Sequence, residues 1–223
     1  MIHTPITADL PIAEAARLMM AEQLAIVHEH LPALRQHAAM TVVHETRKAI
    51  RRTFTQFKLF APYFAPDALE PHRRALRGLM RRLAPSRDLA VFRLKLAAYN
   101  ETADLPLLGL AQQLEDRQDE ADRRLRRYLE RPKVHQRLWR YRRFTKTPGV
   151  GLPPGNGKVA PLLVRHALPT LAFQRLGAVR AFGDLLPTAT PAQFHQLRIQ
   201  FKGLRYSLED VYLQLMKDDD AGG

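Results

Sequence analysis

The sequence predicts an all-α protein of helical bundles, in which two halves related by a pseudo-twofold axis enclose a basic groove. Apolar residues recur at helical spacing along most of the chain, and no segment shows the alternation of a half-buried strand. Glycine and proline gather in the breaks between these segments. One basic motif headed by histidine occurs twice, and a repeat of this kind indicates an internal duplication.

Six helices are expected in the first half, about residues 10–146. They cover about residues 11–38 with Pro32 as a kink, 42–63 with Thr41 as N-cap, a third helix that ends near Ala84 with either Asp67 or Glu70 as its cap, a fourth from Ser86, 104–131, and a short one from 132. Pro85 separates the third helix from the fourth in this interpretation. Ser86 would cap the fourth, and Asp88 would lie in its first turn, where a carboxylate complements the helix dipole.

The second half is expected over residues 161–217, after a linker of glycine and proline at 147–160. It has two helices, about 162–186 and 191–216. Thr190 as N-cap with Gln193 three residues later predicts a capping box at the start of the last helix. Residues 218–223 form a frayed tail. Residues 1–223 would together make a single domain.

The composition limits the classes of function. The 223-residue chain has 35 Lys and Arg against 22 Asp and Glu, and the net charge of +13 favours a polyanionic partner. Cysteine is absent, which excludes a disulfide scaffold, a thiol nucleophile and cysteine-based metal sites. Neither a signal peptide nor an apolar stretch of roughly 20 residues is visible. We therefore expect a cytoplasmic protein without membrane contact.

Two of the expected helices carry the same basic stripe, in which histidine is followed by arginine at +3 and by a basic residue at +7. The stripes are His44, Arg47 and Arg51, with Lys48 beside them, and His195, Arg198 and Lys202, with Arg205 and Tyr206 at the margin. Positions 0, +3 and +7 of a helix fall within about 60° of one another. A basic stripe on a single amphipathic helix is usually an ordinary solvated face. Such a face normally mixes charge signs, however, so the nearly uniform sign of both stripes favours a ligand.

The opposite face of each of these helices is apolar and is expected to lie in a core. These faces are Val42, Val43, Ile50, Phe54, Phe57 and Phe60 in the first helix, and Phe194, Leu197, Phe201, Leu204, Leu208 and Leu215 in the second.

Three motifs resemble those of the CHAD domain family (conserved histidine α-helical domain). They are VHETRKAIRR from Val43, LAPSRDLAV from Leu83 and FHQLRIQFKGLRYSLE from Phe194. The resemblance implies two four-helix bundles around a groove that binds inorganic polyphosphate, and for some members association with polyphosphate granules. It implies as ligand contacts His44, Arg47, Arg51, Arg52, Arg87, His195, Arg198, Lys202, Arg205 and Tyr206, and Lys48 beside the first stripe is a further candidate contact. Asp88 would be structural, as a cap or as the partner of a buried cation.

The sequence departs from the family pattern at three places. Phe54 stands where another arginine is frequent, and Ala90 replaces the second aspartate that the family has in the motif beginning at Leu83. The chain also ends soon after Leu215, so we expect an incomplete second half. The alternatives are a short member, a homodimer that supplies the missing wall, and a truncated chain.

Polyphosphate is a flexible chain of similar phosphates without bases. A site that binds it therefore needs cations repeated at regular spacing, which these stripes provide. From histidine to the residue at +7 a helix rises roughly 10 Å, enough to reach several successive phosphates. Arginine can contact phosphate oxygens with two parallel hydrogen bonds, and lysine adds a point charge.

No catalytic, metal or cofactor site is predicted, so an enzyme is not expected. In the glycine-rich segment 151–159, Leu152 and Val159 break the phosphate-loop pattern. His28 and His30 are two residues apart and point away from each other on a helix.

The runner-up function is nucleic-acid binding through residues 137–144, where cations alternate with aromatic residues. The other interpretation of this segment is an ordinary amphipathic helix in which Leu138, Trp139 and Phe144 are partly buried. A granule-associated scaffold or adaptor is the third alternative.

Overall fold

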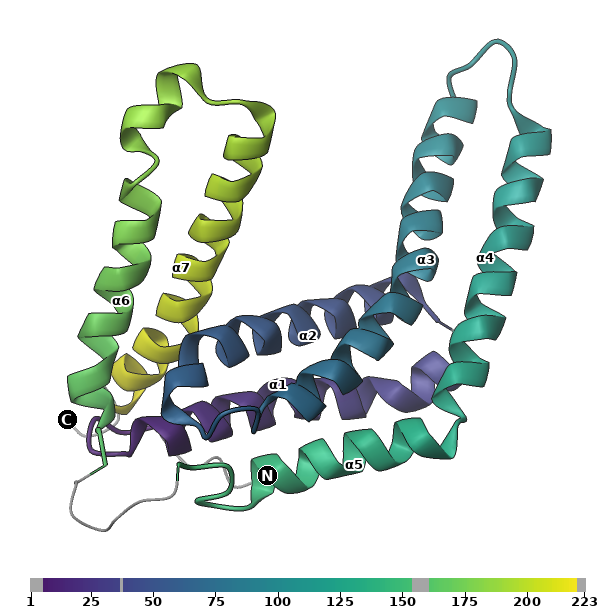
Figure 1. The fold of residues 1–223 in the computed structure, drawn as a ribbon. Coiled ribbons are helices and arrows are strands. Elements are labelled where there is room, and N and C mark those ends of the chain that lie inside the picture. Colours follow the sequence, from purple (N-terminus) through teal and green to yellow (C-terminus); the bar gives the residue numbers. More distant parts are fainter. Residues whose placement is uncertain (1–5, 37, 154–160, 220–223) are drawn as a thin grey trace. The chain divides into compact units, whose positions relative to one another are not determined.

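A computed structural model describes residues 6–36, 38–153 and 161–219 of the chain, which are mostly helical. It does not describe the side chains of residues 206, 207 and 210–219. The helices of this part are α1 (Ile12–Gln36), α2 (Met40–Phe60), α3 (Glu70–Asn100), α4 (Leu108–Leu129), α5 (Pro132–Lys146), α6 (Val164–Arg180) and α7 (Pro191–Asp219), with 3₁₀ helices η1 (Ala61–Tyr63) and η2 (Gly183–Thr188) (Figure 1). The described residues include no strand, only one isolated bridge between Pro11 and Leu163. The predicted all-α class is confirmed.

The expected break at Pro85 is wrong, because α3 runs unbroken through it. A proline inside a helix loses one backbone hydrogen bond and costs about 3 kcal/mol. Leu83 and Ser86 are buried on both sides of Pro85, and α3 packs along α4, so tertiary contacts offset that cost. Ser86 therefore caps nothing, and Asp88 lies in the interior of the helix instead of in a first turn. Thr41 likewise lies inside α2, which begins at Met40.

The contacts divide the chain into two compact units that interleave along the sequence. Unit 1 consists of Met1–Ala21, Arg52–Leu69 and Thr145–Gly223, and unit 2 consists of Glu22–Arg51 and Glu70–Phe144. The predicted halves, 10–146 and 161–217, are based on an internal duplication of the sequence. The division into units is based on contacts, so it does not test them. The predicted linker 147–160 and tail 218–223 lie partly outside the described residues.

Unit 1 is built around the helical hairpin of α6 and α7 and includes the first part of α1 (Figure 1). Its N-terminal stretch pairs with the start of α6, where Ile12 N donates to Leu162 O at 2.9 Å and Val164 N donates to Leu10 O at 2.9 Å. Apolar side chains fill its interior, among them Met19, Met20, Phe57, Phe60, Val164 and Leu168.

The predicted core face of α7 is wrong at three of its positions, whereas Leu197 and Leu204 are half-buried. Phe194, Phe201 and Leu208 are 49%, 53% and 37% exposed. Among the described elements α7 packs chiefly against α6, and one neighbouring helix covers only one side of another. In α2, by contrast, Val43, Ile50, Phe57 and Phe60 are buried as predicted. Completion of the second half by a homodimer stays a prediction.

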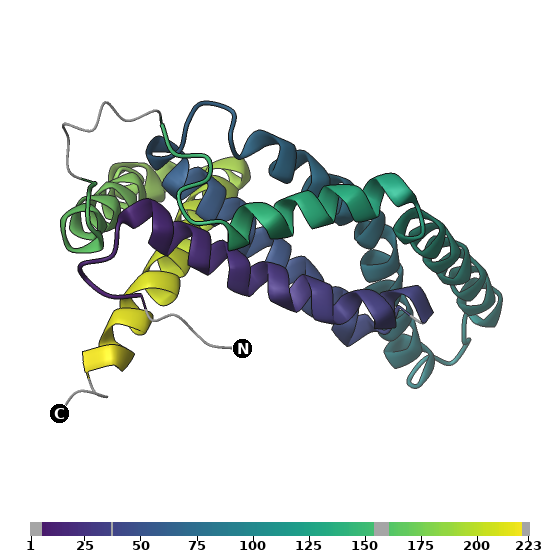
Figure 2. The same cartoon turned by 90° about the horizontal axis from the view of Figure 1, so that it is seen from below.

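Unit 2 contains the long hairpin of α3 and α4, with the second part of α1 running beside α5 (Figure 2). Fully buried leucines of α3 and α4 form its core together with Tyr141 of α5. His72 of α3 is also buried here, with its ring centroid 5.0 Å from that of Tyr141 and 4.6 Å from that of Phe144. No helix in the described part of the chain is long and apolar enough to cross a membrane.

Candidate functional site

The first histidine motif lies on α2, and in unit 2 it borders a hollow of about 320 Å³. His44, Met40, Thr41 and Glu45 line this hollow from α2, and Arg87 lines it from α3. Residues from two of the three sequence motifs therefore meet here, because the first turns of α2 lie next to the middle of α3. The unbroken course of α3 through Pro85 sets the position of Arg87.

Arginines gather around this part of unit 2. Burial lowers the pKa of the half-buried Arg47 guanidinium; the carboxylate of Asp88 raises it again, while the positive charges of Arg51 and Arg87 lower it further. The carboxylate of Asp88 thus stabilises the charge of the half-buried Arg47, while its predicted role as the partner of a buried cation stays a prediction. The Nη1 atoms of Arg47 and Arg87 are shielded from solvent and have no hydrogen-bond partner among the described residues.

Carboxylates limit the positive charge on the same helix. Glu45 forms an ion pair with Lys48, and the hydrogen bond from Lys48 is the main cause of the lowered pKa of Glu45. The Nε2 atom of His44 lies 4.0 Å from Glu45 Oε1. The charge of Lys48 is therefore balanced by a carboxylate of its own helix.

The second histidine motif lies on α7 in unit 1, behind the predicted capping box. Thr190 N donates to Gln193 Oε1 at 2.7 Å, and Gln193 N donates back to Thr190 Oγ1 at 3.3 Å, which confirms this box. The side chains of His195, Arg198 and Lys202 are exposed along the continuous helix that follows.

A carboxylate joins the two motifs within unit 1. Arg52, at the end of the first motif, lies 3.2 Å from Glu209 Oε2, and Arg205 of the second motif lies 3.2 Å from Glu209 Oε1. Glu209 thus bridges an arginine of α2 and an arginine of α7. The side chain of Tyr206 lies outside the described residues.

The structure brings together some of the predicted contacts. In unit 2 these are His44, Arg47, Arg51 and Arg87; in unit 1 they are Arg52 with Arg205, and the aligned His195, Arg198 and Lys202. Convergence of both stripes on one groove stays a prediction. Sequence reasoning missed the carboxylates Glu45 and Glu209 as parts of the site. Their spacing from Lys48 and Arg205, three and four residues, is the signal that could have identified them.

The sequence model of the CHAD domain matches residues 18–218, a span that includes all three motifs. The chain belongs to the CHAD domain family. This confirms the resemblance found in the sequence, and the family is one associated with polyphosphate.

Two solved CHAD-like structures resemble the chain in fold. The crystal structure of the CHAD domain from the plant Ricinus communis has a TM-score of 0.73 and 18% identity, over 94% of this chain and 68% of that chain. PptA from Streptomyces chartreusis has a TM-score of 0.66 and 18% identity, over 94% of this chain and 76% of that chain. No protein with a curated description matches the chain. At this identity the likeness shows the fold alone.

Proposed function

We propose that this CHAD domain binds inorganic polyphosphate through the basic residues of its two histidine motifs and catalyses no reaction on it. The observation that supports this most directly is the cluster of Arg47, Arg51 and Arg87 in unit 2. Two of its guanidinium groups carry a buried nitrogen that no described residue satisfies. Such a donor costs free energy unless an acceptor reaches it.

Phosphate oxygens are suitable acceptors for these donors. The pKa of Arg47 is lowered by burial and by the like charges of Arg51 and Arg87, and Asp88 opposes only part of this effect. An anion near the cluster would relieve the repulsion between the arginines. The same anion could accept two parallel hydrogen bonds from a guanidinium, the bidentate geometry that arginine favours. A chain of phosphates could do so at several arginines with one molecule.

The exposed stripe of α7 extends the same chemistry into unit 1. His195, Arg198 and Lys202 face solvent along one helix, and the rise over seven residues is roughly 10 Å, a span that several successive phosphates can follow. In this proposal the protein acts in the cytoplasm, at polyphosphate granules where these are present. Nucleic-acid binding and a scaffold role at granules are the alternatives that the experiments below separate.

Calorimetry with long-chain polyphosphate tests the site. The double variant Arg51→Glu and Lys202→Glu should lose binding, since it reverses one exposed charge in each motif. The matched control is Lys95→Glu with Arg180→Glu, which makes the same net charge change with one exposed residue in each unit. Binding by the wild type should weaken steeply with added salt, as expected when a polyanion releases counterions.

The outcomes are distinct. Loss of binding in the motif variant alone supports the assignment, whereas an equal loss in both variants would show that net charge alone matters. Unchanged affinity in the motif variant would refute the assignment. Preferential displacement of polyphosphate by DNA or RNA would favour nucleic-acid binding, and a protein partner retained after digestion of the polyanion would favour a scaffold. Release of orthophosphate from polyphosphate by the purified protein would overturn the non-catalytic role.

A further inference from the structure

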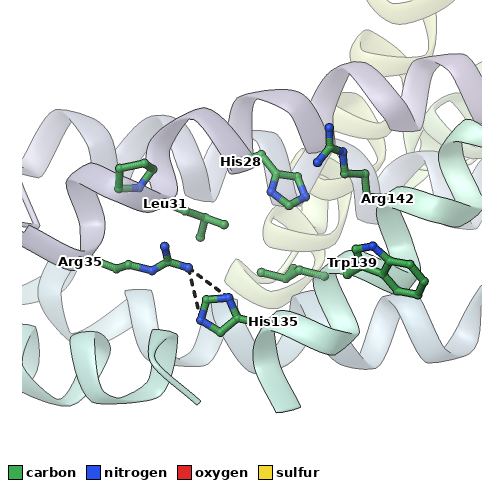
Figure 3. Close-up of a pocket in the computed structure, with 8 residues that line it drawn as sticks. His28, Leu31, Arg35, His135, Trp139 and Arg142 are labelled. Atoms are coloured by element: carbon green, nitrogen blue, oxygen red, sulfur yellow. Dashed lines mark hydrogen bonds between the residues drawn. The ribbon is translucent and has the colours of Figure 1, made fainter. Parts of the chain in front are cut away.

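A second hollow, of about 350 Å³, lies in unit 2 between α1 and α5 and shares no lining residue with the hollow at His44 (Figure 3). Four residues of α1 line it, namely His28, Leu31, Pro32 and Arg35. Four residues of α5 line it from the other side, namely His135, Leu138, Trp139 and Arg142. Its size is within the range of about 300–1,000 Å³ that small-molecule sites occupy.

Both helices present the same pattern to this hollow. Each begins with histidine, continues with leucine at +3 and ends with arginine at +7, so that these side chains share one helical face. Arg35 and His135 lie close together at one end, while Arg142 and Trp139 lie at the other end near His28 (Figure 3). Leu31 and Leu138 are buried and form an apolar base. The hollow therefore has cationic groups at both ends and an apolar middle.

The charges of the hollow favour an anion. Among the described residues that line it, none carries a carboxylate. The hydrogen-bond partner that the structure gives Arg35 is the ring of His135, at 3.3 Å from Nδ1, and the buried Nε of Arg35 has no partner in the described part of the chain. The buried Nε of Arg35 is therefore a donor left without an acceptor among the described residues. A phosphate placed between Arg35 and His135 could accept hydrogen bonds from both.

Trp139 favours an aromatic group on the same ligand. Its side chain is 56% exposed although it lies in a hollow, and the guanidinium of Arg143 lies 5.8 Å from the ring centroid. From His135 to Trp139 the helix rises about 6 Å, a separation that suits a phosphate joined to an aromatic ring through a sugar. Stacking of a base on an aromatic side chain contributes binding energy without reading the identity of the base.

We propose that this hollow is a binding site for a nucleoside phosphate, with the phosphate at Arg35 and His135 and the base against Trp139. Arg142 and His28, at the other end, would hold further phosphate oxygens or the sugar hydroxyls. The site is separate from the polyphosphate motifs and does not depend on the function proposed for them. It accounts for the basic and aromatic segment 137–144 without a nucleic-acid strand.

The chain offers a direct probe, because Trp139 is its sole tryptophan. Tryptophan fluorescence should be quenched saturably by ADP, with excitation at wavelengths that the nucleotide does not absorb. Adenosine lacks the phosphates and tripolyphosphate lacks the base, so each should displace ADP from the hollow at least about ten-fold more weakly than ADP itself binds there. The double variant Arg35→Gln with Arg142→Gln should weaken ADP binding at least about ten-fold. The motif variant Arg51→Glu with Lys202→Glu should bind ADP as the wild type does.

Calorimetry on Trp139→Leu extends the test to a variant without the reporter and should also show weakened ADP binding. Circular dichroism of every variant verifies the helical fold. Absence of saturable quenching in the wild type would refute the proposal, and so would ADP binding that both arginine substitutions leave intact. Displacement of ADP from the hollow by tripolyphosphate at an affinity equal to that of ADP would overturn the ligand class, and loss of ADP binding in the motif variant would assign the nucleotide to the polyphosphate site.

Discussion

His72 should make the stability of this protein depend on pH well above the range in which carboxylates titrate. The side chain is 9% exposed and lies among the rings of Tyr141 and Phe144. Desolvation by burial lowers the pKa of His72 from 6.5 to about 4 in the folded protein. The neutral imidazole is thus the form that the fold accommodates, and acid is the perturbation that acts against it.

The size of the effect follows from the two pKa values. The unfolded chain binds the proton first as pH falls, so the stabilisation is complete above about pH 6.5 and is lost as pH approaches 4. The difference of about 2.5 pKa units (6.5 minus 4) corresponds to about 3.4 kcal/mol at full protonation. Between pH 7.5 and pH 5 the free energy of unfolding should fall by about 2 kcal/mol through this one residue.

Urea unfolding at these two pH values measures the effect, with His72→Leu as the variant that cannot titrate. The fall in unfolding free energy should be about 2 kcal/mol smaller in His72→Leu than in the wild type. Val134→Ala is a control that removes buried apolar volume from the same unit and keeps His72, so its pH dependence should match that of the wild type. An identical fall in His72→Leu and wild type would refute the reasoning.

Two further predictions concern the bridge at Glu209 and the packing of α3 on α4. Glu209→Gln removes the carboxylate shared by Arg52 and Arg205 and should tighten polyphosphate binding about two- to five-fold in calorimetry; weaker binding would show that the bridge orders the site instead. Gly78→Ala should stabilise a Tyr128→Phe background by about 1 kcal/mol in urea unfolding and the wild type by less, because a Cβ at residue 78 would lie 2.5 Å from Tyr128 Oη. Equal gains in both backgrounds would contradict this contact.

Local signals predicted much of the fold correctly. The capping box of Thr190 and Gln193 and the helix start at Pro132 are confirmed, because a cap or an N-terminal proline involves only residues a few positions apart. Pro85 shows where such signals fail. Its cost is local, but the compensation comes from the packing of α3 along α4, which no short segment reveals.

The residues of the candidate site could be predicted more completely than their environment. The motifs identified His44, Arg47 and Arg87, and the structure places them around one part of unit 2. The bridge from Arg52 to Glu209 joins residues 157 positions apart, so only the folded chain shows it. The interpretation of segment 137–144 as an ordinary helix with Trp139 partly buried is wrong for Trp139, which is 56% exposed. Its position in a hollow with Arg35 depends on the pairing of α1 with α5, which no short segment reveals.

The interleaved units also set an order for folding during synthesis. Unit 2 is complete at Phe144, so a nascent chain that has emerged to this residue contains all of its packing partners. Unit 1 cannot close until residues 162–165 are made, because the backbone of Ala8, Leu10 and Ile12 pairs with that stretch. During this interval the early part of α1 has apolar residues without their native neighbours, and such surfaces are where nascent proteins aggregate. During synthesis, unit 1 therefore completes its packing later than unit 2.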